Sequence, residues 1–516
     1  MNNQDSIGFL KGGSIGEGFT IRLLSDVKLE EVRLGDFVVV QGKIYRFFGI
    51  VDDLKLLSYN EDVFFDPPDT PLKEFAIKGN ITFSEASVSS YLMVDSGGHL
   101  FSIKTMPEHF SCVRKATQED LELVFGKNVK KPFFVGMPLT MDEHIYLDLD
   151  KLCMRNNAIF GITGSGKTVL AKIIFAGIIK ENVSSLLIFD MHNEYGRNSR
   201  GEEGVTPALK TFFPERVKVF DVSVENRDAD QYVTIPLKYI EPEDLSLLST
   251  ILSYSERSEE TALIVGRIKG REWLKYLFSL QDAGEEKRQE EAQILGVNPN
   301  SLSALVRHTQ RLRRLRFLED TEEESSIDMM LNCLKSGVSV VVQFSGMYYN
   351  DPLCYFLVSN VISRRIHRRY EDLEEEEREK RRIVIVVEEA HKFLSTESKE
   401  GNIFGIIARE MRKFNVTLFI IDQRPSEIDP DVLSQVGTRF TLQLLDEKDI
   451  DAVFQGVSGG ARLRKILRSI EHREALLFGY ALPMPVAIKV REFGEELFSE
   501  MQKPSKGSSP IDDLYG

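Results

Sequence analysis

One segment of the chain leaves few alternatives for the fold, because a glycine-rich run lies between a short apolar stretch and a helical one. Residues 161–168 read Gly-Ile-Thr-Gly-Ser-Gly-Lys-Thr and match the pattern G-x-x-x-x-G-K-[ST]. Residues 157–160 suit a buried strand, and residues 169–175 contain neither glycine nor proline and suit a helix. Strand, loop and helix therefore follow in the order that a phosphate-binding loop requires.

Each residue type in this loop has a role in holding phosphate groups. Glycines let backbone N–H groups converge on phosphate oxygens, and the following helix presents the positive end of its dipole. Lys167 is expected to reach the β- and γ-phosphates, and the Thr168 hydroxyl to ligate Mg²⁺. A chance glycine-rich turn would leave both flanks unexplained. We therefore expect nucleotide binding by Gly161, Thr163, Gly164, Ser165, Gly166, Lys167, Thr168 and Val169.

Length and composition indicate a soluble protein of more than one domain. At 516 residues the chain is longer than one hydrophobic core usually supports. It contains no apolar stretch long enough to span a membrane, and its start lacks the features of a signal peptide. We therefore expect a cytoplasmic protein without membrane contact. The formal net charge of −15 argues against non-specific DNA binding over the whole surface but permits a local basic channel.

The N-terminal part of the chain is rich in strand patterns. Residues 1–108 contain short alternating runs separated by turns, which suggests a small β-barrel. This barrel is either an assembly or substrate-guiding module or a plain stability domain, and the pattern does not separate these alternatives. Residues 109–150 are expected to be a connector.

The remainder of the chain reads as an α/β domain interrupted by helices. Residues 151–241 and 325–495 carry continuous apolar runs typical of buried parallel strands. Residues 242–324 are helical and rich in charge, which predicts an inserted helical subdomain. Residues 496–516 are expected to be a disordered tail.

The helical insertion contains the densest basic cluster of the chain. Arginines three and four positions apart share a helix face, as a patch that contacts phosphate groups would require. The alternative, which we favour, is a solvated face that pairs with the acids of residues 319–324. The cluster consists of Arg307, His308, Arg311, Arg313, Arg314 and Arg316.

Acidic residues follow two of the apolar runs. Glu388 and Glu389 come directly after residues 383–387. In phosphate-loop enzymes the first such acid holds the Mg²⁺ shell and the second polarises the attacking water, so we assign these roles to Glu388 and Glu389. The first acid is more often the shorter Asp. Asp190 ends another run, at the sheet edge where ligands gather, and is a further candidate for the metal.

Polar and basic residues flank the strand predicted over residues 416–421. Gln423 lies just after it and is placed to sense the γ-phosphate or to orient water. Arg409 and Arg412 lie before it, and either arginine could stabilise the transferring charge in a neighbouring subunit. Both are equally consistent with salt bridges.

The order of these motifs resembles that of HerA ATPases, which belong to the HerA/FtsK branch of hexameric DNA motors. The resemblance covers nearly the whole chain, including an N-terminal barrel in which residues 34–38 look like the characteristic turn of that family. The segments that carry it are residues 161–168, 189–195, 386–394, 408–414 and 422–425.

The resemblance implies a RecA-like P-loop ATPase core with an inserted helical subdomain, preceded by a small β-barrel. It implies a ring, usually a homo-hexamer, that hydrolyses ATP with Mg²⁺ at subunit interfaces and threads double-stranded DNA through a central pore. Arg412 matches a family arginine that reaches the nucleotide of the neighbour, and Arg155 matches another interface arginine. Residues 485–490 resemble the terminal brace against the adjacent subunit.

The resemblance favours an ATP-dependent DNA translocase or helicase that drives or regulates a partner nuclease. A NurA-like nuclease or a defence effector is expected to dock on the barrel side, in DNA end processing or antiphage defence, and the sequence does not choose between these settings. The alternative is a nucleotide-gated oligomeric scaffold that activates a bound effector without moving along DNA. A conjugative or secretion ATPase of similar fold is weakened by the lack of a membrane segment.

Overall fold

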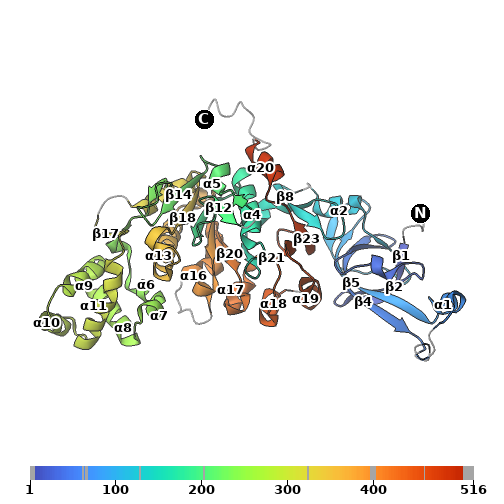
Figure 1. The fold of residues 1–516 in the computed structure, drawn as a ribbon, viewed down its shortest axis with the longest axis horizontal. Coiled ribbons are helices and arrows are strands. Elements are labelled where there is room, and N and C mark those ends of the chain that lie inside the picture. Colours follow the sequence, from blue (N-terminus) through green and yellow to red (C-terminus); the bar gives the residue numbers. More distant parts are fainter. Residues whose placement is uncertain are drawn as a thin grey trace.

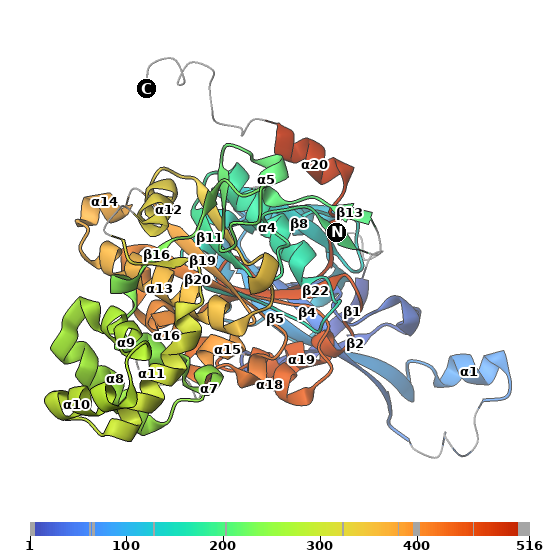
Figure 2. The ribbon, with the colours of Figure 1, turned by 60° about the vertical axis from the view of Figure 1, so that its left-hand side comes forward.

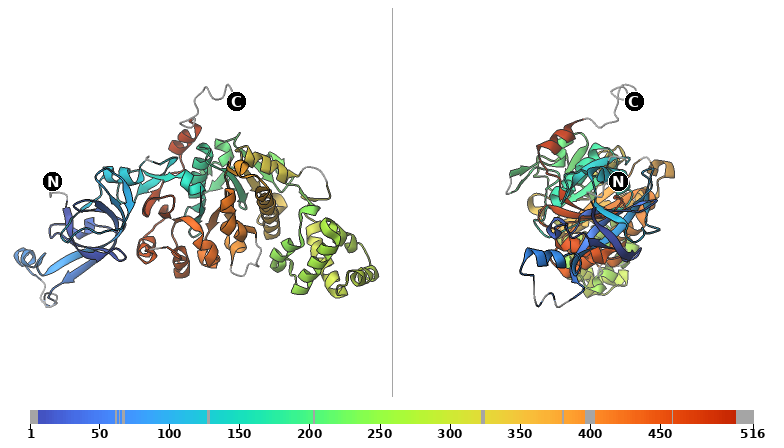
Figure 3. Two further views of the ribbon diagram at one scale, coloured as in Figure 1. Left: turned by 180° about the vertical axis from the view of Figure 1, so that it is seen from behind. Right: turned by 90° about the vertical axis from the view of Figure 1, so that its right-hand side faces the viewer.

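The computed structural model describes residues 6–503 except 61–62, 64, 66–67, 127–128, 202–203, 322–324, 380, 396–402 and 458. The molecule is elongated, with a barrel at one end, a large sheet with its helices in the middle and a helical subdomain at the other end (Figure 1). The view from behind shows the same order (Figure 3). Among the described helices, none has the length and apolar character needed to cross a bilayer.

The N-terminal domain is a closed barrel, as the sequence predicts. Its strands follow the order β2-β1-β7-β3-β4-β5, and β5 pairs again with β2 to close the sheet. The short strand β6 (Leu100–Ser102) pairs with the edge of β5. Helix α1 (Pro71–Ile77) lies near the tip of the long hairpin of β4 and β5, which projects from the barrel (Figure 2). The barrel strands are β1 (Ser6–Ser14), β2 (Gly18–Leu23), β3 (Phe37–Gln41), β4 (Arg46–Ser58), β5 (Thr82–Val94) and β7 (Cys112–Lys115).

The segment predicted as a connector, residues 109–150, is structured and divides between two domains. Strand β7 completes the barrel, while β8 (Pro132–Pro138) and β9 (Ile145–Asp148) form a hairpin at one edge of the core sheet. Helices α2 (Gln118–Phe125) and α3 (Leu149–Cys153) lie before and after this hairpin. The prediction was wrong because the hairpin is short and its partner, β23, lies more than 300 residues later in the sequence.

The core is one twelve-stranded sheet with the order β15-β14-β18-β11-β19-β20-β10-β21-β22-β23-β8-β9. The strands from β15 to β21 are parallel, and the four beyond them are antiparallel. The central strands are fully buried, which explains their continuous apolar runs. The bounds are β10 (Asn156–Phe160), β11 (Ser185–Asp190), β14 (Val217–Asp221), β15 (Gln231–Tyr232), β18 (Ser339–Gln343), β19 (Ile383–Glu388), β20 (Val416–Asp422), β21 (Val436–Thr441), β22 (Glu474–Gly479) and β23 (Val486–Val490).

Helices lie around this sheet (Figure 1), together with the β12–β13 hairpin and the parallel pair of β16 and β17. Helix α4 follows the phosphate loop directly, and α13 and α16 pack against each other beside the strands that carry the acids. These and the remaining elements of the core are α4 (Lys167–Lys180), α5 (Leu209–Phe212), α12 (Ser326–Lys335), α13 (Pro352–Glu371), α14 (Glu375–Glu379), α15 (His391–Leu394), α16 (Ile403–Glu410), α17 (Pro430–Ser434), α18 (Glu447–Val453), α19 (Gly460–Arg468), β12 (Ser199–Gly201), β13 (Gly204–Thr206), β16 (Ile235–Pro236) and β17 (Leu318–Glu319).

The helical subdomain occupies the segment for which the sequence predicts it. Its joint to the core is charged, because Arg364 of α13 donates to the buried Asp244 of α6 at 2.6 Å. In the basic cluster, Arg313 forms two hydrogen bonds with Asp282, at 2.8 and 2.9 Å. Of the acids that we expected to pair with the cluster, Glu322, Glu323 and Glu324 lie outside the described residues. The helices are α6 (Pro242–Leu247), α7 (Ser249–Leu252), α8 (Glu256–Lys269), α9 (Trp273–Gln281), α10 (Glu285–Leu295) and α11 (Pro299–Arg313).

The C-terminal part differs from the expectation in two respects. Residues 496–502 are not disordered but belong to helix α20 (Glu495–Gln502), because Leu497 and Met501 lie on one helix face and are buried. Residues 504–516 of the predicted tail lie outside the described residues. The predicted brace to a neighbour is β23, which pairs with β22 and β8 of its own chain and is therefore an internal strand.

Candidate functional site

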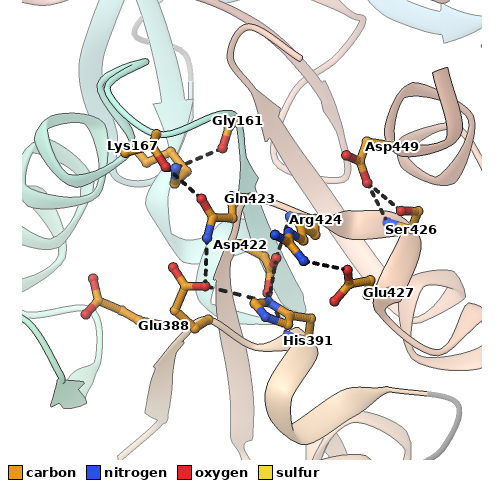
Figure 4. Close-up of polar contacts among 12 residues, drawn as sticks. Gly161, Lys167, Glu388, His391, Asp422, Gln423, Arg424, Ser426, Glu427 and Asp449 are labelled. Carbon is orange, nitrogen blue, oxygen red and sulfur yellow. Dashed lines mark hydrogen bonds and ion pairs between the residues drawn. The ribbon is translucent and has the colours of Figure 1, made fainter. Parts of the chain in front are cut away.

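The phosphate loop joins β10 to α4 at the carboxyl edge of the parallel strands. Gly164 and Gly166 have φ angles of 80° and 103°, a backbone region that glycine adopts readily. The Lys167 ammonium donates hydrogen bonds to the carbonyls of Gly161 and Ile162 at 2.8 and 2.9 Å (Figure 4). The loop thus curves around the amino group that is expected to meet the phosphates.

Glu388 is the last residue of β19 and lies buried beside the loop. Its Oε1 accepts a hydrogen bond from the Tyr195 hydroxyl at 3.1 Å, whereas its Oε2 is buried and has no partner among the described residues. Burial, with the nearby charges of Asp190 and Glu194, raises the pKa of Glu388 well above its ordinary value. A buried carboxylate oxygen without a partner suits a role in holding a cation or its water molecules.

Asp190, which we assigned to the metal, has a different role in the structure. Its side chain is buried and accepts hydrogen bonds from the backbone N–H groups of Glu194, Tyr195 and Gly196 at 2.7, 2.9 and 3.1 Å. The Gln343 amide adds a fourth at 3.2 Å. Because these donors use its oxygens, Asp190 fixes the turn after β11, and we no longer place it on the metal.

Glu194 is the acid of this turn that reaches the loop, a contact that the sequence did not assign. Its Oε2 accepts a hydrogen bond from the Thr168 hydroxyl at 2.8 Å. The available signal was weak, because Glu194 is only one of several polar residues that follow the same strand.

The charges around the loop fit a divalent cation. Carboxylates outnumber the two nearby ammonium groups, Lys167 and Lys172, whose pKa values are lowered by burial. No set of three or more His, Cys, Asp or Glu side chains within the described residues is close enough to hold a metal by itself. This agrees with Mg²⁺, which keeps several waters and takes phosphate oxygens as ligands. Thr168 would bind it directly, and Glu388 would hold its water shell.

Glu389 and Gln423 lie on the other side of the loop. The Gln423 amide donates to Glu389 Oε2 at 3.1 Å, and its oxygen accepts a hydrogen bond from the Thr163 hydroxyl at 2.7 Å. Glu389 itself has a φ angle of 48°, an uncommon value that turns the chain sharply at the end of β19. The structure thus brings Glu389 and Gln423 together and joins them to the phosphate loop through Thr163.

His391 and Asp422 lie next to each other beside Gln423 (Figure 4). His391 Nδ1 lies 3.0 Å from Asp422 Oδ2 and 3.7 Å from Glu389 Oε2. Burial of the imidazole opposes its protonation, but the hydrogen bond with Asp422 and the charges of Asp422 and Glu389 outweigh burial and raise the pKa of His391. The imidazole thus links the proposed catalytic carboxylate to β20.

The three predicted arginines lie at the opposite edge of the sheet. Arg155 precedes β10, whereas the phosphate loop follows it, so the five residues of this strand separate them by about 17 Å. Arg409 and Arg412 lie before the neighbouring parallel strand β20. All three line one open hollow of about 420 Å³. Arg155 stacks on the Tyr480 ring at 4.7 Å, while no carboxylate among the described residues pairs with Arg409 or Arg412.

A family model described as "Helicase HerA, central domain" matches residues 133–366. The chain is therefore similar to HerA central domains over this segment. The matched segment contains β10, the phosphate loop, β11 and the helical insertion, and it ends before β19 and β20. It confirms the resemblance to HerA ATPases and the expectation of a helicase-type ATPase.

Curated HerA proteins are similar over most of this chain. The "DNA double-strand break repair helicase HerA" of Pyrococcus furiosus is 23% identical over 74% of this chain and 73% of that protein. The protein of the same name from Sulfolobus acidocaldarius is 24% identical over 95% of this chain and 94% of that protein. Among solved structures, VirB4 of Thermoanaerobacter pseudethanolicus is 16% identical, with a TM-score of 0.48, over 73% of this chain and 99% of that chain.

Proposed function

We propose that this HerA-family chain assembles into a ring in which ATP, bound with Mg²⁺ at the phosphate loop of one subunit, is hydrolysed with the help of arginines from the next. The observation that carries this proposal is the separation of Lys167 and Arg412 at opposite edges of one sheet. Arg412 cannot reach the phosphate loop of its own chain, yet it lies exposed in a basic hollow without a carboxylate partner among the described residues. In a ring, the arginines of one subunit would meet the phosphate loop of the next, and the two together would form a complete site.

The chemistry within the site follows from the side chains present. Lys167 and the loop amides bind the phosphates, and bound Mg²⁺ neutralises their charge. Glu389 takes the proton of the attacking water, while Gln423 holds Glu389 and the water in line with the phosphate. Arg412 of the neighbour would stabilise the charge that develops on the transferred group, with Arg155 and Arg409 beside it.

We further propose that this turnover drives movement along double-stranded DNA in a central pore and that a nuclease or other effector docks on the barrel. The names of the Pyrococcus and Sulfolobus relatives, which are DNA repair helicases, support the DNA substrate. The barrel supports the docking role because it lies at one end of the molecule, apart from the site, and its hairpin projects outward (Figure 2). A hexamer is the assembly that the resemblance favours.

The test is displacement of a bound strand or protein block from duplex DNA by the purified chain. The wild-type chain should displace the block only while it hydrolyses ATP, and Lys167→Ala should lose both activities because the phosphate cation is gone. Lys287→Ala, an exposed lysine of α10, serves as the matched control. Sizing by native mass spectrometry would report the number of subunits. Hydrolysis without any displacement, with or without a nuclease partner, would favour a nucleotide-gated scaffold instead.

A further inference from the structure

The hydrogen bond between Thr168 and Glu194 links the phosphate loop to the turn after β11, in which the sequence assigned no role to Glu194. The Thr168 hydroxyl has one hydrogen and two lone pairs. It donates its hydrogen to Glu194 Oε2 at 2.8 Å, and the lone pairs are thereby left for a cation. The orientation of the hydroxyl is therefore set by the carboxylate that receives its hydrogen.

The turn that carries Glu194 is held firmly on two strands. Asp190 at the end of β11 accepts the backbone N–H of Glu194 at 2.7 Å. Asn193, with a φ angle of 57°, places its side-chain amide against the backbone of Phe344, which it contacts at 2.9 Å through the carbonyl and at 3.2 Å through the N–H. Asp190 ends β11 and Phe344 directly follows β18, so the backbone of Glu194 is held between the ends of two neighbouring strands.

Lys172 supplies positive charge on the same side of α4. It follows Thr168 by four residues and therefore lies one turn further along the same helix face. Its side chain is 1% exposed, and within the described residues its ammonium forms no ion pair closer than 4 Å and only a 3.4 Å hydrogen bond to the Ser199 hydroxyl. Glu194, Asp190 and Glu388 are the carboxylates whose charges act on it. A buried ammonium without an ion pair is costly unless nearby negative charge offsets it.

We propose that Glu194 is a positioning residue that orients the Thr168 hydroxyl toward the divalent cation. This inference rests on the proposed function, because it needs nucleotide and Mg²⁺ at the phosphate loop. Glu194 acts through Thr168, and Glu389 remains the carboxylate that activates water. Glu194 and Glu388 would thus serve the metal side of the loop, and Glu389 the water side.

The test measures Mg²⁺ dependence of nucleotide binding and requires no turnover. The full chain is titrated with Mg²⁺ in the presence of a fluorescent, slowly hydrolysed ATP analogue, and the Kd of the analogue is also measured in EDTA. Glu194→Ala should raise the Mg²⁺ concentration for the half-maximal response about tenfold, as is usual when a residue supporting a metal ligand is lost. Its Kd in EDTA should stay within about twofold of wild type, because the phosphate loop itself is unchanged.

Two further variants keep the result interpretable. Glu194→Gln loses the charge but retains an oxygen that can accept the Thr168 hydrogen. It should therefore shift the Mg²⁺ response less than Glu194→Ala does. If circular dichroism shows that Glu194→Ala does not fold, Glu194→Gln replaces it in the test. Glu215→Gln, an exposed glutamate before β14, is the control and should match wild type.

The possible outcomes distinguish a failure of the Glu194 role from a failure of the proposed function. A Glu194→Ala chain with the wild-type Mg²⁺ response would overturn the positioning role alone. The same role would be overturned if its Kd in EDTA rose in parallel with the Mg²⁺ requirement, since Glu194 would then shape the loop rather than the metal contact. A wild-type chain that bound the analogue without any response to Mg²⁺ would instead contradict the proposed function, and this inference with it.

Discussion

The Thr163 hydroxyl donates a hydrogen bond of 2.7 Å to the amide oxygen of Gln423, although the two residues are 260 positions apart in the sequence. The other end of the same amide donates to Glu389 at 3.1 Å. One side chain therefore connects the phosphate loop with the carboxylate that we expect to activate water. A nucleotide that displaces Thr163 would also change the position of Glu389.

We expect Gln423→Ala to lower kcat for ATP hydrolysis about a hundredfold, the usual loss when one positioned hydrogen-bond donor is removed from an active site. The KM for ATP should change little, because Lys167 and the loop amides still bind the phosphates. Steady-state phosphate release measures both quantities, with the exposed Gln293→Ala as control. An unchanged kcat would show that the amide links the two segments without a role in turnover.

Glu389→Gln should bind ATP but hydrolyse it at least about a hundredfold more slowly, since the amide cannot accept the proton of the attacking water. Retention of radiolabelled ATP on a filter, followed by thin-layer analysis of the bound nucleotide, separates binding from cleavage. Glu215→Gln controls for the loss of a surface carboxylate. The assignment would fail if Glu389→Gln turned over ATP at the wild-type rate.

Arg412→Ala should be inactive as a pure protein and regain part of its activity when mixed with Lys167→Ala. In a mixed assembly, the intact loop of an Arg412→Ala subunit can meet the intact arginine of a Lys167→Ala subunit. ATPase activity plotted against the mixing ratio should therefore pass through a maximum, while Lys413→Ala mixed in the same way provides the control for a neighbouring cation. Zero activity at every ratio would count against a site shared between subunits.

The stability of the barrel should depend on pH through Asp120 of α2. Its carboxylate contacts Arg46 of β4 at 3.1 Å and Arg114 of β7 at 2.5 Å. Burial opposes ionisation of this group, but the hydrogen bond and charge of Arg114 and the bond from Thr117 outweigh burial and lower the pKa of Asp120 from 3.8. This stabilisation is therefore complete above about pH 4, where the unfolded chain is ionised, and is lost as the pH falls through the lowered pKa.

Asp120→Asn should accordingly destabilise the barrel by about 3 kcal/mol at pH 7, because two arginines lose their buried partner. Calorimetric melting of the wild type and the variant at pH 7, 5, 4 and 3 measures the difference. The two should converge toward the lowest pH, where the wild-type carboxylate is also protonated. A difference that stayed constant down to pH 3 would assign the loss to packing rather than to charge.

The parts of the site that could be predicted from the sequence are the residues that directly follow a buried strand. The residues from Gly161 to Thr168 and the pair Glu388 and Glu389 each follow a continuous apolar run, so the pattern of apolar residues alone locates the ends of these strands. The sequence also predicts that Arg155 and the phosphate loop lie at opposite edges of the sheet, because Arg155 precedes β10 and the loop follows it.

The choice between Asp190 and Glu194 could not be made in this way. Both follow β11 within four residues, and the difference lies in a turn that directs one carboxylate onto backbone amides and the other toward Thr168. That turn depends on Asn193 and on its contact with Phe344, about 150 residues away. The β8–β9 hairpin and helix α20 were missed for a related reason, because their burial depends on distant segments such as β23 and Phe212.

The placement of the phosphate loop and Arg412 at opposite edges of the sheet affects how many reaction centres an assembly can complete. If Arg412 serves the phosphate loop of a neighbour, as proposed, each chain contributes halves to two different reaction centres. An open row of subunits then leaves an unfinished half at either end, and only closure of the row gives every protomer a working centre. A gap in the circle would silence one centre without damaging any single chain, and the fraction of silent centres would then measure how many circles are incomplete.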